Sequence, residues 1–244
     1  MFVVFFFTQF NLADSLFNNK YFDLAEIEYK RLFFFDSNLV GDRKMRLNHT
    51  ISVLHTNPMR GYEEAQRLLN NFAELDEESK INLGISLGEC GFHSFAIEVL
   101  SQTGEKKWTG YYCLLNGQYN KARTLFLEAN AFELVQELDC FNRIFLKSPV
   151  KAMLMSVLVP GTGELYAGNL RLAVFDFLLT AGSGYLFYNA VRGKKYVDAG
   201  LILSIFFNRF YFGSISNAGR TVQKKNEENR KKWLAEFRKK YFNK

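Results

Sequence analysis

Cysteine, histidine and acidic side chains are the groups through which this chain could perform nucleophilic or metal chemistry. The three cysteines are odd in number and lack C-x-x-C spacing, which predicts core residues rather than disulfides or a metal site: Cys90, Cys113 and Cys140. The three histidines show neither H-x-x-x-H nor H-E-x-x-H spacing: His49, His55 and His93. Acidic pairs such as Glu63 and Glu64 are predicted at helix starts or on polar faces. We therefore expect no catalytic site, metal or cofactor, and no enzyme.

A glycine-rich segment after residue 160 is the other stretch with a chemical precedent. Gly161-Thr162-Gly163 could suggest a phosphate-binding loop. The next residues are Glu164-Leu165-Tyr166, with no third glycine at the dinucleotide spacing and no Gly-Lys-Ser/Thr. A phosphate site is therefore not expected here.

The chain has two halves of opposite net charge, and these halves must position any site. Through Phe145 there are 14 Lys/Arg against 19 Asp/Glu, and from Leu146 onward there are 17 against 6. The basic half also holds two long apolar stretches, 172–191 and 199–216, each near the ~20 residues that a helix needs to cross a bilayer. This pattern indicates an acidic water-soluble half joined to a basic membrane-embedded half. The overall basic charge is therefore not a nucleic-acid signal, and a nucleic-acid partner is not expected.

The acidic half contains a recurring frame of small residues at helical spacing. Gly110, Ala122, Phe126 and Ala129 define it most clearly, and the other copies centre on residues whose small side chains let two antiparallel helices approach: Ala25, Ala65, Gly84 and Ala96. These residues resemble the tetratricopeptide repeat, whose small–small–aromatic–small pattern they follow over residues 11–146. The anchor alanines are unevenly spaced, so the expected array is irregular. An irregular all-α domain without true repeats is the alternative.

The repeat resemblance implies a binding role. Repeats of this kind usually hold peptides or protein surfaces on a concave face, so a protein or peptide partner is expected on the repeat domain. Candidate inner-face residues are Arg43, Arg46, Asn82, Tyr111 and Asn116.

The start of the basic half carries a second motif. The apolar run Ala152–Val159 is too short to span, and Pro160 would end it, which predicts an interfacial helix at 151–159 followed by a turn. The turn reads Pro160-Gly161-x-Gly163-x-x-Tyr166-x-Gly168, and spans are predicted at about 171–192 and 197–216. This motif resembles small bacterial membrane domains of the TM2 type and a group, without assigned function, often found behind tetratricopeptide repeats. The resemblance implies residence in a bacterial inner (cytoplasmic) membrane, and Glu164 departs from the uncharged residue that such families often carry.

Two charges fall inside the predicted spans. Asp176 and Arg209 lie at similar depths from the turn at 192–196 on antiparallel helices. Because an ionised group in lipid is costly unless it is paired, we expect Asp176 and Arg209 to face each other or to meet through water. The pair is expected to be structural, and an ion or proton pathway is the alternative. Small residues around Gly182 and Gly200 would allow close helix packing or self-association into a homo-oligomer.

The last segment, residues 218–244, holds 10 Lys/Arg against 3 Glu and an aromatic residue every four positions. It is predicted to be a basic amphipathic tail that lies on an anionic membrane surface. The residues expected to contact that surface are Lys224, Lys225, Arg230, Lys231, Lys232, Trp233, Phe237 and Tyr241. A solvated tail that stops translocation is the alternative.

Residues 1–10 are uncharged and almost wholly apolar, which fits a secretory signal or an apolar N-terminal segment. The predicted order is therefore 1–10, repeats at 11–146, membrane domain at 147–217 and tail at 218–244. The repeats would be periplasmic with a signal and cytoplasmic without one. The expected fold is all-α, with a tetratricopeptide-like hairpin array, a transmembrane hairpin and a basic C-terminal helix.

Two functions fit these expectations. The first is a membrane-anchored helical-repeat scaffold or adaptor that holds a protein partner at a bacterial membrane. The second is a small two-span membrane component, in transport or lipid handling, that its repeat domain regulates.

Overall fold

The computed structural model describes residues 12–71, 75–144 and 146–242, and within them every regular element is helical. The all-α prediction is therefore confirmed. The chain divides into two compact units, Met1–Gln136 and Glu137–Lys244. The division falls inside α9 (Phe132–Ile144), earlier than the predicted boundary at residue 146. The predicted signal at residues 1–10 lies outside the described residues.

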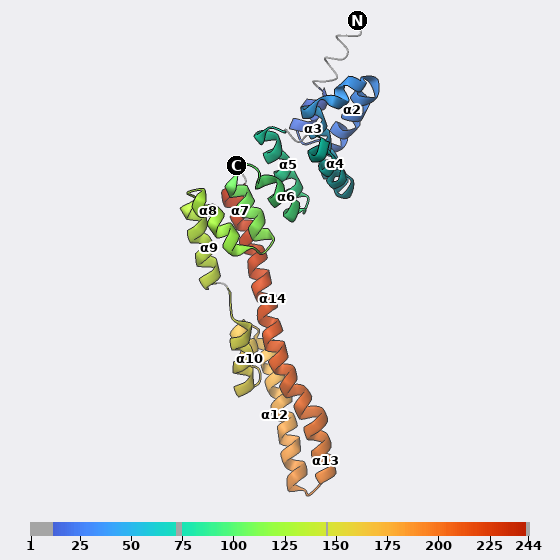
Figure 1. Cartoon of the computed structure of the whole chain (residues 1–244). Helices are drawn as coiled ribbons and strands as arrows, with labels where there is room; N and C mark the ends of the chain where they lie inside the picture. Colours follow the sequence, from blue (N-terminus) through green and yellow to red (C-terminus); the bar gives the residue numbers. More distant parts are fainter. Residues whose placement is uncertain (1–11, 72–74, 145, 243–244) are drawn as a thin grey trace. The chain divides into compact units, whose positions relative to one another are not determined.

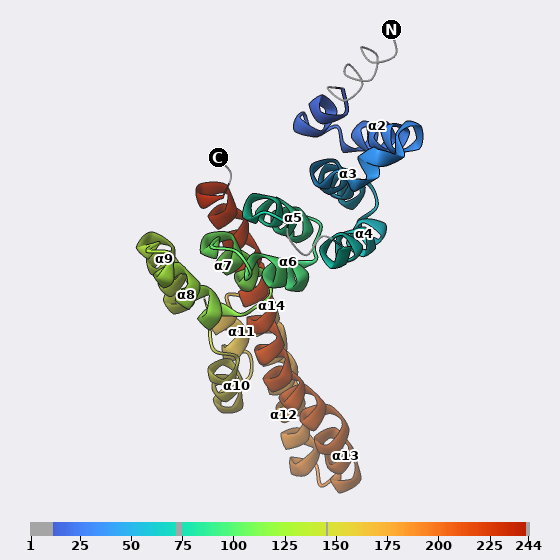
Figure 2. The same cartoon turned by 45° about the horizontal axis from the view of Figure 1, so that its top comes forward.

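The N-terminal unit is a succession of antiparallel helix pairs (Figure 2). A short helix at 12–18 is followed by helices that pair in chain order: α2 (Phe22–Phe35), α3 (Arg43–Thr56), α4 (Pro58–Asn71), α5 (Glu77–Glu89), α6 (His93–Leu100), α7 (Lys106–Leu115) and α8 (Tyr119–Glu128). A 3₁₀ turn, η1 (Ser37–Gly41), links α2 to α3. Acidic side chains start several of these helices; for example, Asp42 accepts the Met45 N–H at 2.9 Å at the start of α3.

Three of the pairs share the same turn. At the end of the first helix of each pair, a backbone N–H donates a hydrogen bond to the carbonyl oxygen five residues earlier. The donors are Tyr21, Phe92 and Gln118, at 2.9, 3.0 and 2.8 Å. The residue before each closing amide has positive φ, at Lys20, Gly91 and Gly117. This is a Schellman-type end, which releases the chain into the second helix of the pair. The same type of helix end also occurs before Ala131, Asn169 and Lys195, so it is a feature of helix ends throughout the chain.

The predicted small-residue frame lies at the contacts between paired helices. Ala25, Ala65, Ala96 and Ala122 are fully buried, and Ala129 is half-buried. A Cβ at Gly84 would lie 2.6 Å from the Leu100 side chain, and one at Gly110 would lie 2.6 Å from the Phe126 ring. Each glycine thus makes room for the large residue of its partner helix. The spacing of the small residues in the sequence therefore reflects the close approach of the two helices in each pair.

Phe126 is the largest residue in this frame of α7 and α8, and it is fully buried. We expect Phe126→Ala to lower the local free energy of unfolding of this pair by ~3–5 kcal/mol, because a ring-sized cavity would remain. Hydrogen exchange of the α7 and α8 amides in the full chain measures this loss. Leu127→Ala, at a 37% exposed neighbour, serves as the control with a loss below about 1 kcal/mol. Equal losses in the two variants would contradict the packing role.

An acid–base contact joins α3 to α4. His49 Nδ1 lies 3.3 Å from Glu64 Oε2, although the two groups are misaligned for a hydrogen bond. Burial alone would raise the pKa of Glu64, but the contact with His49 and the charges of His49, Arg60 and Arg46 together hold that pKa below its usual value.

A lowered pKa means that ionised Glu64 stabilises the folded state. This contribution is present above the ordinary pKa of the carboxyl and is lost as pH falls through the lowered value. We expect exchange protection of the α3 and α4 amides to fall between about pH 5 and about pH 3, and Glu64→Gln to remove part of that dependence. The exposed neighbour provides the control, Glu63→Gln, which should retain the wild-type profile. An unchanged profile in Glu64→Gln would refute the role of this contact.

The C-terminal unit is built on one long hairpin (Figure 1). Its first arm is α12 (Leu170–Arg192), and its second runs without a break through α13 (Tyr196–Leu201), the π-helical η2 (Ile202–Phe207) and α14 (Asn208–Tyr241). Two short helices, α10 (Pro149–Leu158) and α11 (Thr162–Ala167), pack on α14. The predicted interfacial helix at 151–159 corresponds to α10. The predicted tail at 218–244 is not a separate element, because α14 continues through it.

Candidate functional site

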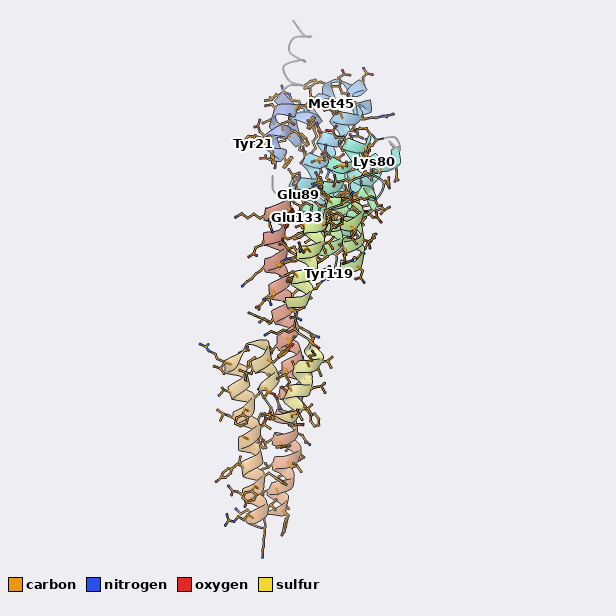
Figure 3. The ribbon with its side chains drawn as sticks, turned by 90° about the vertical axis from the view of Figure 1, so that its left-hand side faces the viewer. Tyr21, Met45, Lys80, Glu89, Tyr119 and Glu133 are labelled. Carbon is orange, nitrogen blue, oxygen red and sulfur yellow. The ribbon has the colours of Figure 1, made fainter. Side chains whose placement is uncertain are left out.

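The hairpin of the C-terminal unit exposes most of its apolar side chains. Both of its arms are long and apolar enough to cross a membrane: an 18-residue window has a mean hydropathy of 1.3 in Leu170–Arg192 and of 1.2 in Tyr196–Tyr241. Only 22% and 11% of these windows are buried inside the chain. Figure 3 shows the side chains projecting outward along both arms. The core helix of a water-soluble protein would bury most of this surface, so the hairpin is suited to an apolar environment.

The five predicted motif residues come together where α10, α11 and α12 connect. Gly161 and Gly168, with φ of +91° and +90°, bracket α11 in a conformation that side chains with a Cβ rarely adopt. A Cβ at Gly163 would overlap the carbonyl oxygen of Ala152 and lie 2.5 Å from the Ala218 Cβ. Pro160 is half-buried and directly follows Val159, the residue that caps the C-terminal end of α10. The motif therefore folds a short helix tightly against α10 and α14.

Tyr166 contacts Lys147, the residue with which the chain approaches α10 and this junction. Its carbonyl oxygen accepts a hydrogen bond from Lys147 Nζ at 2.7 Å, and the same ammonium lies 5.3 Å from the Tyr166 ring centroid. The backbone of Lys147 exchanges two hydrogen bonds with the Asn226 side chain on α14, at 3.0 and 2.8 Å. The start of the C-terminal unit is thereby tied to both α11 and α14.

Buried polar side chains hold the interior of the junction. The Gly161 N–H donates to Ser214 Oγ at 3.0 Å, and the Gly163 N–H donates to Ser156 Oγ at 3.0 Å. The Ser156 hydroxyl in turn donates to Glu164 Oε2 at 3.3 Å. Glu164 is fully buried. The residue that departs from the expected motif is therefore at the centre of the site.

Asp176 faces this centre from α12. It is 7% exposed, lies within hydrogen-bonding reach of Glu164 and accepts a hydrogen bond from Asn217 Nδ2 at 3.5 Å. The structure does not bring Asp176 and Arg209 together: the Arg209 side chain is exposed, and no ion pair joins the two within the described residues. The direct form of the predicted Asp176–Arg209 contact is therefore wrong, because Asp176 is buried while the Arg209 side chain lies on an exposed face of the second arm.

The aromatic stripe of the predicted tail is not on the surface. Trp233 is 9% exposed and Phe237 is fully buried, and Trp233 stacks on Phe141 of α9 with centroids 4.4 Å apart. Tyr241 donates to Glu137 of α9 at 2.6 Å. The prediction that these aromatics contact a membrane surface is therefore wrong, because they bind the second half of α9.

The charged residues of the predicted tail lie on the other faces of α14. Four of them are exposed: Lys224, Lys225, Lys231 and Lys232. Arg230 instead pairs with Glu227 at 2.8 Å, and that pairing lowers the pKa of the glutamate.

The N-terminal unit offers a groove on the side formed by the first helices of its pairs. It is a hollow of about 280 Å³ between the turn at 17–22, α3 and α5. Amide side chains from each of these elements line it, at Asn18, Asn48 and Asn82, and Glu89 is labelled in Figure 3. His55 stacks on Phe22 at 4.1 Å, and burial lowers its pKa, so this ring is neutral at pH 7. Asn18 and Asn82 are exposed, whereas Asn48 is 8% exposed and donates to Asp14 Oδ1 at 3.3 Å. Of the predicted inner-face residues, Asn82 lies here.

A second hollow, of about 640 Å³, lies between α4, α5 and α6. Lys80 (labelled in Figure 3) and Glu98 give it one charge of each sign, and Tyr62 and Phe95 give it an aromatic floor. The repeat pattern did not indicate this hollow.

The described residues include histidine, cysteine and acidic side chains that could serve as metal ligands or nucleophiles. No three His, Cys, Asp or Glu side chains among them are grouped to hold a metal ion. Burial raises the pKa of Cys90 to about 11, so its thiol is un-ionised at pH 7.

Sequence reasoning missed three residues that form hydrogen bonds in the junction: Ser156, Ser214 and Asn217. The available signal was the spacing of Ser214 and Asn217 on one face of the second arm.

No family model matches this chain, and comparisons with curated proteins and with solved structures likewise gave no match.

Proposed function

We propose that this chain is a membrane-anchored helical-repeat scaffold or adaptor that binds a protein partner in extended form. The observation that carries this proposal is the groove of about 280 Å³ lined by side-chain amides from the turn at 17–22, α3 and α5. Amide side chains suit a peptide backbone because they both donate and accept hydrogen bonds. The exposed apolar hairpin supplies the anchor, and the motif resemblance favours the bacterial cytoplasmic membrane.

The hairpin also constrains the proposed topology. With both arms in the bilayer, the turn at 192–196 lies on one side, and α10 and the C-terminal half of α14 lie on the other. The exposed lysines of α14 favour the cytoplasm for that side, because basic residues near spans usually remain there.

A crosslinking experiment tests the partner-binding role. A photoreactive amino acid at Asn18, on the rim of the groove, should yield a discrete crosslinked protein in intact membranes. Asn82→Trp should abolish that product, because the indole would fill the groove. Arg67→Trp, on the exposed face of α4, is the matched control and should leave the product unchanged. Loss in both variants, or no product in the wild type, would reject the proposal.

One observation favours the second candidate, a small transport or lipid-handling component: two carboxyl groups are buried together at the head of the hairpin. If the carboxyl pair is part of a transport path, Asp176→Asn should abolish the transport or lipid-handling activity of the chain. The same variant should leave crosslinking at Asn18 intact. Retained cellular function in this variant would favour the scaffold.

A further inference from the structure

The carboxyl groups of Glu164 and Asp176 are buried in the junction, and one of their oxygen atoms accepts no hydrogen bond from the described residues. Glu164 is fully buried, and Asp176 is 7% exposed. Ser156 satisfies Glu164 Oε2, and Asn217 bonds Asp176 Oδ2. Glu164 Oε1 is buried without a donor. A buried acceptor left in this state costs free energy, so the site requires one more donor.

The surrounding charges do not provide that donor. On α10 the side chain that contacts Glu164 is the neutral Ser156, and on α14 the one that contacts Asp176 is the neutral Asn217. Lys147, before α10, bonds the Tyr166 carbonyl instead. The other basic residues on α10, α12 and the second arm near the junction have exposed side chains: Lys151, Arg171, Arg209 and Arg220. Within the described residues, neither carboxyl group has an ion-pair partner.

We propose that Glu164 and Asp176 form a buried proton-binding site, which holds one proton between the two carboxyl groups and thereby keeps α11 packed on α12. A proton supplies the missing donor to Glu164 Oε1 and reduces the charge of the pair to −1. Two ionised carboxylates in contact would repel each other in a buried site, as in the carboxyl pairs of aspartic proteases. Burial first, and then Asp176 opposite it, raise the pKa of Glu164 above its usual range. This site does not depend on the partner-binding proposal.

The site predicts a particular direction of pH dependence. The folded chain binds a proton that the unfolded chain releases above the ordinary pKa of a glutamate. Stability is therefore greatest at low pH and falls as pH rises toward the raised pKa. One proton corresponds to a loss of up to about tenfold in the folding equilibrium constant for each pH unit within that range. Above the range, Glu164 loses this proton and the contact between α11 and α12 weakens.

Infrared spectroscopy of the full chain in lipid vesicles tests for the proton directly. The wild type should show the C=O stretch of a protonated carboxylic acid at about pH 7, and this band should move when the glutamates are labelled with carbon-13 or when Asp176→Asn is introduced. Glu164→Gln should lose the band. The exposed Glu236→Gln is a matched control on α14 and should keep it. Absence of the band in the wild type would overturn the proposal without requiring any variant to fold.

Unfolding in mixed detergent micelles provides the second measurement. Between about pH 5 and about pH 7, the wild type and Glu236→Gln should lose stability together, whereas Glu164→Gln should show a flatter profile. Equal slopes in all three proteins would refute a titrating pair. If the wild type lacks the protonated band but is stabilised by sodium over choline, the site binds an alkali cation, and the proton proposal is overturned.

Discussion

Replacing Gly163 by alanine is expected to disrupt the packing of α10 and α11 on α14. The added Cβ would overlap the Ala152 carbonyl oxygen and lie 2.6 Å from Ser156 Oγ. One of these atoms belongs to the backbone, so rotation of a side chain cannot relieve the overlap. We expect a loss of about 3 kcal/mol or more in the stability of the C-terminal unit, at the upper end of overpacking effects. Hydrogen exchange of the α10 and α11 amides in detergent measures the loss.

Gly182→Ala is the matched control for this substitution. Gly182 lies in α12, and no atom lies within 4 Å of a Cβ built there. Alanine is favoured over glycine inside a helix by roughly 0.5–1 kcal/mol, so this variant should be as stable as the wild type or more stable. If Gly163→Ala behaves like Gly182→Ala, the tight junction described above is incorrect.

The parts of the fold that sequence reasoning predicted correctly depend on local spacing. Gly110 and Phe126 are close in sequence, and their contact joins two helices of one hairpin. The two apolar helices were likewise predictable from length and hydropathy, because both are properties of a continuous segment.

The errors concern partners that are distant in sequence. The four-residue period of Trp233, Phe237 and Tyr241 correctly indicated one helix face, but the partner of that face is Phe141 on α9. An amphipathic face looks the same whether it binds lipid or a helix from the same chain. Sequence periodicity therefore identified the surface and not its occupant.

The predicted partner of Asp176 failed for a related reason. Matching depths on two antiparallel helices placed Arg209 opposite it, but depth does not determine rotation about the helix axis. In the structure, Asp176 faces Asn217 and the Glu164 side chain, which enters from α11. A short helix between two glycines of positive φ is difficult to predict, because its placement depends on contacts with α10 and α14. The carboxyl pair became apparent only from these three-dimensional contacts.

Introducing two arginines on the exposed face of α12 is expected to prevent stable membrane integration. Leu178 and Leu186 are 61% and 56% exposed and lie near the middle of this helix. Arginine near the centre of a spanning helix costs about 2.5–3.5 kcal/mol, so Leu178→Arg with Leu186→Arg should cost about 5 kcal/mol or more. The double variant should leave the carbonate-resistant membrane fraction, in which the wild type should remain.

The corresponding substitution in the N-terminal unit separates a membrane effect from a general effect of charge. Ile27 on α2 is 59% exposed, which is close to the value for Leu178. Because α2 is not part of the apolar hairpin, Ile27→Arg should remain in the membrane fraction with the wild type. If the wild type is found in the soluble fraction, or if all three proteins partition alike, lipid does not cover the hairpin. The apolar face would then require another partner, and the anchoring function would be excluded.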